Sequence, residues 1–314
     1  MRRAIPGSAR CVARYAVTAL GVAACWPAPA PAATAEPGAG QLMAQAFPGW
    51  RDDAAGRVRT VSVPHIPGVT DARGASWETG AQRVLAAPGL VLHTDATHLT
   101  LIAGLVPAGP DGKSTATHLV PMALAAYQFE RRGGAWTLAA SQGVFALRGF
   151  FGQAGLRGVT LAGQHQGLAV EYGSCWGGYC GSWLALYELH GATLQGTPLV
   201  EMALTGTNIH AVADCARRLQ PLIKAPPIDT GVHEGGLDDS GVAPDSHDCY
   251  AVDSNWHIGP ARGQAGDLVV RYHGAISRAE AHAAAPVAID QRQVLRYEGG
   301  RYRAVEGFNP VPGM

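Results

Sequence analysis

The alternation of apolar and polar residues changes character near residue 90. Before that point, residues 40–47 (GQLMAQAF) have the apolar spacing of a short helix, and a Pro-Gly pair follows them directly. A second short helix is predicted within residues 75–87 (ASWETGAQRVLAA), which also precede a Pro-Gly pair. Residues 36–89 are therefore expected to form an N-terminal segment with one or two short helices.

From residue 90 to residue 314, short segments rich in Val, Leu, Tyr and Thr alternate with turn residues, which is typical of β-strands. Glycine-containing turns at residues 132–134, 190–192 and 298–300 indicate hairpins. Successive hairpins form an antiparallel meander whose strands bury one face. We therefore predict a mainly β protein, folded as a sandwich or a strongly curved sheet, with a propeller-like arrangement as the alternative.

The first 35 residues have the pattern of a secretory signal peptide. Four basic residues precede the apolar run of residues 15–26, namely Arg2, Arg3, Arg10 and Arg14. That run is shorter than the roughly 20 residues that cross a bilayer as a helix. Cleavage after Ala35 would release a soluble periplasmic or secreted protein, whereas the lipobox-like sequence ending at Cys25 would give an outer-membrane lipoprotein.

Charge and composition narrow the choice of partners. Without residues 1–35, the 24 basic residues fall to 20 against 24 acidic residues, a net charge of −4. An acidic protein is a poor partner for nucleic acid, since phosphate binding depends on clustered Lys and Arg. Only two of the basic residues are lysines, and Ala and Gly are abundant, which indicates a GC-rich bacterial genome.

The four cysteines after the leader predict two disulfides, because exported proteins meet an oxidising compartment. Cys175 and Cys180 lie between two predicted strands of one hairpin, whereas Cys215 and Cys249 both lie within the irregular segment at residues 206–250 and would close a loop of about 35 residues in it. We therefore expect the pairs Cys175–Cys180 and Cys215–Cys249. A thioredoxin-like centre would need C-x-x-C at a helix N-terminus, and a zinc site would need closely paired cysteines, so both are weaker alternatives.

Two aromatic residues, Trp176 and Tyr179, lie inside the tight loop closed by the first predicted disulfide. Exposed Trp and Tyr residues are frequent anchors for a protein partner or a sugar. The alternative is that both rings fold back over the sheet edge and only cover it. The sequence leaves both interpretations open.

The segment between Lys224 and Arg262 contains seven acidic residues and no basic one. Carboxylates crowded in a Gly-rich loop suit Ca²⁺, which binds 6 to 8 oxygens, and Asp238, Asp239 and Asp245 are the candidate ligands. The EF-hand pattern is absent, so a solvated acidic loop and a docking surface for a basic partner are the alternatives.

The sequence contains none of the catalytic motifs that would indicate a hydrolase. The chain contains neither the G-x-S-x-G nor the H-E-x-x-H pattern, although a triad built from distant residues would not be visible in a sequence. We expect an exported bacterial envelope protein that binds a protein or glycan of the envelope without catalysis, as an inhibitor or immunity-type module does. The alternative is an exported hydrolase that acts on an envelope polymer. Contact with a membrane is expected only if Cys25 carries lipid.

Overall fold

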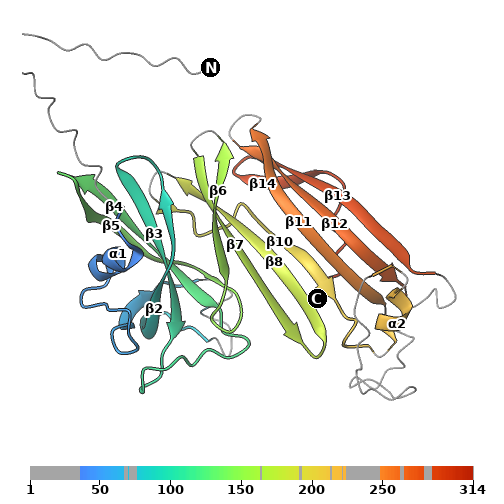
Figure 1. The fold of residues 1–314 in the computed structure, drawn as a ribbon, viewed down its shortest axis with the longest axis horizontal. Helices are drawn as coiled ribbons and strands as arrows, with labels where there is room; N and C mark the ends of the chain where they lie inside the picture. The colour runs from blue at the N-terminus through green and yellow to red at the C-terminus, as the bar shows by residue number, and fades with distance from the viewer. Residues whose placement is uncertain are drawn as a thin grey trace, which may run out of the picture. The chain divides into compact units, whose positions relative to one another are not determined.

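The computed structural model describes residues 36–66, 70, 76–162, 165–190, 193–212, 214–220, 222–223, 248–261, 265–278 and 285–313. Pro37–Met314 is one compact unit of antiparallel β-sheet (Figure 1). Within the described residues, no helix is both long enough and apolar enough to span a membrane.

The first sheet is a five-stranded meander in which each strand pairs with the next along the chain. One face packs on a core that includes Trp77, Leu101 and Phe129, and the short helix α1 adds Leu42 and Met43 to this core. Its elements are α1 Ala39–Ala46, β1 Val58–Val63, β2 Gly80–His93, β3 His98–Pro107, β4 Met122–Arg132 and β5 Ala135–Arg148.

The second sheet has the strand order β14-β13-β12-β11-β10-β8-β7-β6, with β9 paired to β8. It is strongly curved, because Val159 of β6 and Tyr302 of β14, at opposite ends of this order, lie in the same core. Its elements are β6 Gly155–Ala162, β7 His165–Trp176, β8 Tyr179–His190, β9 Thr193–Leu194, β10 Val200–Thr207, α2 Cys215–Leu219, β11 Cys249–Ala261, β12 Gly266–Ser277, β13 Val287–Glu298 and β14 Arg301–Glu306.

A third core joins the two sheets. Ile102 and Leu124 of the first sheet pack with Leu168 and Tyr187 of the second, all of them fully buried. At the edge of β5, the Gln142 side chain donates to the Leu194 carbonyl at 2.5 Å and accepts from the Leu194 N–H at 3.0 Å. The amide therefore imitates a strand and closes this edge against β9.

The predicted fold class is confirmed, since the chain is an antiparallel meander with one strongly curved sheet and a short N-terminal helix. The second helix expected within residues 75–87 was wrong: β2 begins at Gly80 and runs through residue 89, the expected end of the N-terminal segment. Val84 and Ala86 are buried at alternate positions, so strand pairing on both sides overrides the helical pattern. The Pro-Gly pair lies at a bulge in β2, where the ladder tolerates it.

Two-residue turns set the register of the hairpins. Gly133–Gly134, Gly177–Gly178 and Gly299–Gly300 all have positive φ angles, between 55° and 87°. Two successive positive φ angles define the type I′ turn, whose twist matches that of the strands it joins. The hairpins predicted at residues 132–134 and 298–300 are confirmed, and the pairing of β8 with β9 confirms the third.

The predicted cysteine pairing is confirmed. Cys175–Cys180 joins directly opposite residues of β7 and β8, with Cα atoms 4.0 Å apart. Cys215–Cys249 joins α2 to the start of β11, with Cα atoms 5.1 Å apart. Both Cys215 and Cys249 are fully buried in a small core, whereas Cys175 is exposed.

We predict that the two disulfides contribute unequally to stability. Replacing Cys215 and Cys249 by Ser should lower the free energy of unfolding by about 4 kcal/mol, because that bridge closes a long loop, and the same change at Cys175 and Cys180 by about 2 kcal/mol. Urea unfolding of both double variants would measure this. Equal losses, or a larger loss for the hairpin pair, would contradict the prediction.

Candidate functional site

One face of the second sheet packs on the first sheet. Along the β7–β8 hairpin, this face extends past the contact with the first sheet. Side chains at alternate positions of a strand share one face. On β7 this face carries buried Val170, then half-buried Tyr172 and Ser174, and finally Trp176, which is 72% exposed. Exposure on this face of β7 therefore increases from the core between the two sheets to the aromatic residue at the end of the strand.

Trp176 lies on His118, which comes from the loop between β3 and β4. The two rings are stacked, with centroids 4.9 Å apart and planes 24° apart. Phe151, which is 51% exposed, meets the same imidazole edge-on at 5.1 Å. Tyr179, the cross-strand partner of Trp176, is 39% exposed. These four residues, His118, Phe151, Trp176 and Tyr179, are called the aromatic surface below.

Phe151 is held outward by its backbone. Its N–H donates to the His118 carbonyl at 3.3 Å, and the N–H of Gly152 donates to the Val120 carbonyl at 2.7 Å. Phe151 has φ 53°, which makes it the sole non-glycine residue with positive φ in the described part of the chain. A Cβ on Gly152 would lie 2.0 Å from Val106, so glycine is required there. Such strain is often found at functional sites.

A second layer of rings supports the aromatic surface. Phe150 stacks on His118 at 5.6 Å and contacts Trp183 at 5.7 Å. Trp183 and Tyr172, a cross-strand pair, are themselves stacked at 5.9 Å. Aromatic contacts of this kind stabilise beyond their buried area, by about 0.5–1.5 kcal/mol each. The rings therefore tie the hairpin to the loops of the first sheet.

A polar group lies at the inner end of these rings. The Tyr172 hydroxyl donates to one oxygen of Glu201, and Arg148 donates to the other oxygen at 3.0 Å. Burial is the main cause that raises the pKa of the Tyr172 phenol well above its usual range, and its hydrogen bond to the Glu201 carboxylate raises it further. Tyr172 therefore stays a donor at neutral pH. The Arg148–Glu201 ion pair links β5 of the first sheet to β10 of the second.

One residue of the aromatic surface, His118, also forms a pair with a serine that could take part in catalysis. His118 Nε2 and Ser174 Oγ share a short hydrogen bond. A serine beside a histidine is the start of a nucleophilic dyad, which normally needs a third group to orient the imidazole. Among the residues described here, no carboxylate is hydrogen-bonded to His118.

The residues singled out by the sequence fall into two groups. Trp176 and Tyr179 lie together on the hairpin, next to the Cys175–Cys180 bridge. Asp238, Asp239 and Asp245 lie outside the described residues. Within the part that is described, no group of three or more His, Cys, Asp or Glu residues is placed to hold a metal ion.

Three further residues escaped the sequence analysis. Phe151 carried a weak signal, since it lies between closely spaced glycines in GFFGQAG. His118 and Ser174 carried none, because they are 56 residues apart and meet only in the folded chain.

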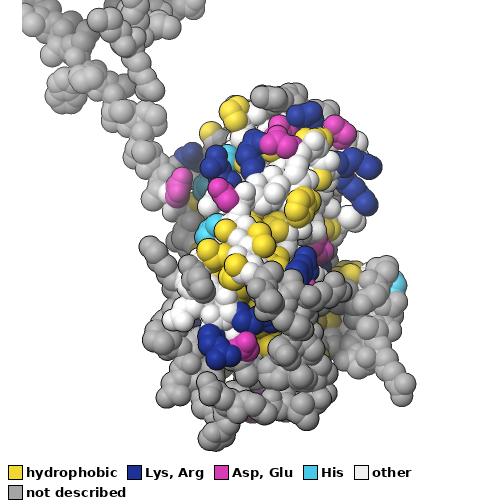
Figure 2. All heavy atoms as spheres, turned by 90° about the vertical axis from the view of Figure 1, so that its right-hand side faces the viewer, with side chains coloured by type: hydrophobic (Ala, Val, Ile, Leu, Met, Phe, Trp, Pro, Cys, Tyr) yellow, Lys and Arg dark blue, Asp and Glu magenta, His cyan; other side chains and the backbone are white. Residues whose placement is uncertain are grey.

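A different apolar region lies on the far side of the second sheet. Figure 2 shows hydrophobic side chains gathered on that face. A cavity of about 430 Å³ there is lined by Ile276, Val287, Ile289 and Phe308, among others. Arg278 and Ala285, which also line it, flank a segment outside the described residues.

Comparison with known proteins adds no family. No protein-family model matches the chain, and no curated protein matches it. One solved structure, an "Ntf2 like protein involved in plasmid conjugation", aligns over 71% of this chain and 75% of its own, with 4% identity and a TM-score of 0.14. A likeness at that score carries no argument about fold or function.

We predict that Arg148 and Glu201 are energetically coupled. In a double-mutant cycle with Arg148→Met and Glu201→Gln, the coupling should be about 1 kcal/mol, because the Arg148 side chain is only 17% exposed. The more exposed Arg292–Glu306 pair is a matched control, expected to give less than about 0.5 kcal/mol. Chemical denaturation measures both values. A cycle at Arg148 and Glu201 no larger than the control would refute the link.

Proposed function

We propose that the protein is an exported bacterial envelope protein that binds another macromolecule without catalysis, and that the aromatic surface is its binding site. The observation that carries this proposal is Trp176, a large aromatic side chain that is mostly exposed at the end of a closed hairpin. Trp and Tyr are the residues most enriched at interface hot spots.

Rigidity supports a binding role. A disulfide and a type I′ turn constrain the backbone on either side of Trp176, and the stack on His118 positions its indole. A side chain that is already ordered loses little entropy on binding, so more of its contact energy appears as affinity. One face of the indole rests on His118, and the exposed remainder is available to a partner.

Exposed apolar side chains around Trp176 also support a binding role. Phe151 and Leu119, the neighbour of His118 in the chain, are 51% and 72% exposed. Clusters of exposed apolar side chains commonly mark interaction sites. Together with Trp176 they favour a protein partner or a glycan of the envelope, in the manner of an inhibitor or immunity-type module.

The proposed location rests on the N-terminal sequence and on the disulfides. The pattern of residues 1–35 is that of a signal peptide, and disulfides persist in oxidising compartments. We therefore place the protein in the periplasm or outside the cell, or at the outer membrane if Cys25 carries lipid.

We predict that changing Trp176 and Phe151 to Ala abolishes partner binding. Each truncation should weaken affinity at least about thirtyfold, which corresponds to a hot spot of about 2 kcal/mol. Immobilised wild type and double variant would be compared for what they retain from envelope extract and from purified cell-wall glycan, identified by mass spectrometry.

Phe308→Ala is the matched control, since Phe308 is 64% exposed and lies outside the aromatic surface. Retention by wild type and by the control, with loss in the double variant, is the expected result. Equal retention by all three proteins would refute the site, provided that their thermal melts agree.

A hydrolase remains the second candidate, because Ser174 and His118 form a hydrogen-bonded pair. A reactive serine would be labelled covalently by a fluorophosphonate, and the label would disappear in His118→Gln. We expect no labelling of Ser174, as measured by peptide mass spectrometry. Labelling that depends on His118 would replace the binding proposal with the enzyme.

A further inference from the structure

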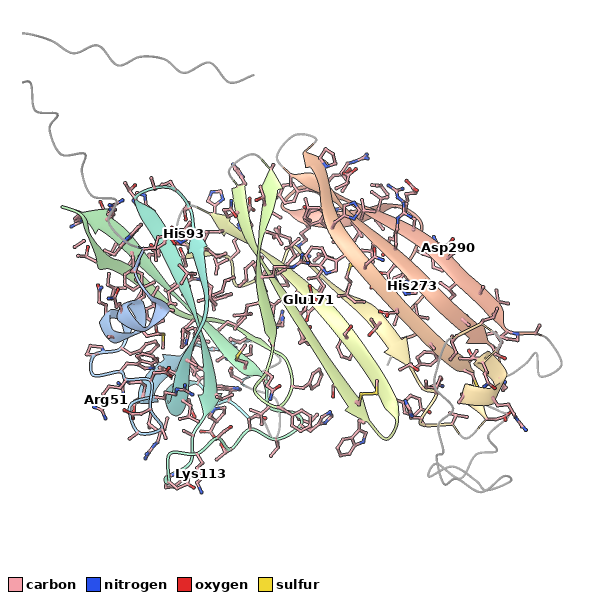
Figure 3. The ribbon with its side chains drawn as sticks, in the orientation of Figure 1. Arg51, His93, Lys113, Glu171, His273 and Asp290 are labelled. Carbon is pink, nitrogen blue, oxygen red and sulfur yellow. A yellow bond between two sulfur atoms is a disulfide. The ribbon has the colours of Figure 1, made fainter. Side chains whose placement is uncertain are left out.

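The strand β7 has an open backbone edge beside the aromatic surface. Its pairing with β6 ends at Gly155 and Glu171, whereas β7 continues to Trp176 (Figure 1; Glu171 is labelled in Figure 3). Among the described residues, 172–176 therefore pair with β8 alone. An unpaired strand edge is a template for another strand.

The register shows which groups face outward. In an antiparallel pair, alternate residues turn both N–H and C=O toward the partner strand. Trp176 faces Tyr179 across a two-residue turn, so it belongs to the hydrogen-bonded set, together with Ser174 and Tyr172. Gly173 and Cys175 must then turn their N–H and C=O groups away from β8. The close Cα atoms of Cys175 and Cys180, 4.0 Å apart, agree with a non-hydrogen-bonded pair.

These outward groups are accessible. Gly173 and Cys175 are both exposed, and within the described chain their backbone makes no hydrogen bond on the open side. The Cys175–Cys180 disulfide and the turn at Gly177–Gly178 join this edge covalently and by a tight reversal to β8. Two donors and two acceptors thus lie in a row next to Trp176.

The two faces beside this edge differ. One carries Ser174 and Trp176, with Phe151 near them. The other carries Glu171, which accepts from Trp256 at 3.1 Å and pairs with Arg157 at 3.3 Å. A strand added here would place alternate side chains against an aromatic face and a polar face.

We propose that the partner binds by strand addition: an extended peptide segment pairs with the β7 edge at Gly173 and Cys175 and inserts alternate apolar side chains beside Trp176. This inference rests on the proposed binding function and specifies the partner as polypeptide. In this mode of recognition, main-chain hydrogen bonds provide affinity and side-chain contacts provide specificity.

The probe is a linear peptide selected from a random phage-displayed library on the immobilised full chain. Selected sequences should alternate apolar and polar residues and lack proline inside the alternating part. Residue-resolved amide exchange by NMR should then show slower exchange at Gly173 and Cys175 when the synthetic peptide is bound. If no peptide binds saturably, or if these two amides are unchanged on binding, strand addition is excluded.

Gly173→Pro removes the outward N–H and blocks the edge, so peptide affinity should fall at least about tenfold. Gly173→Ala is the matched control: it adds the same Cβ, 3.0 Å from the Gly181 carbonyl oxygen, but keeps the N–H. The control should retain affinity within about threefold. If Gly173→Pro does not fold, the amide exchange of the wild type decides alone.

The outcomes separate this inference from the proposed function. Loss of binding in the Trp176/Phe151 double variant, with no effect of Gly173→Pro and no amide protection, would refute strand addition and leave the aromatic site standing. Sensitivity to Gly173→Pro with protected edge amides, but full binding by the double variant, would support the edge and refute the aromatic site. A glycan that protects neither amide would also overturn the inference.

Discussion

The apolar core between the two sheets is the interaction on which the rest of the structure depends. Leu168, Val170 and Tyr187 of the second sheet pack on residues such as Ile102 and Leu124 of the first. Because a strand presents every second side chain to the same face, this contact also determines which way Tyr172, Ser174 and Trp176 point. Any ligand that meets Trp176 therefore meets loops of the first sheet as well.

Loops of the first sheet complete the aromatic surface at this hairpin end. His118 stacks on one face of the Trp176 ring. Phe151, held at positive φ, contacts the same imidazole edge-on and adds to the exposed apolar surface. Neither contact involves neighbouring residues of the chain. The arrangement combines a rigid aromatic anchor with free backbone groups at the adjoining edge, which are the two components of recognition by strand addition.

The edge strand β5 is covered by side chains, unlike the described edge of β7. Gln142 pairs with Leu194 at one part of β5, and Gln45 of α1 covers another by bonding to the backbone of Trp136 and Leu138. Side-chain amides thus occupy groups that would otherwise invite a foreign strand. Residues 172–176 of β7 receive no such cover among the described residues, and this stretch ends in the exposed Trp176.

Sequence alone determined the features that depend on near neighbours. Short strands, glycine turns and the spacing of Cys175 and Cys180 are local features, so the β class, the hairpins and the first bridge could be predicted from them. The Cys215–Cys249 bridge was predicted as well, because these are the two cysteines that remain after the leader and the hairpin pair. The strand β2 was not, because Val84 and Ala86 acquire their partners from β1 and β3. Only the tertiary structure brought His118 to Ser174 and Trp176, since contacts across 56 residues leave no pattern in a single sequence.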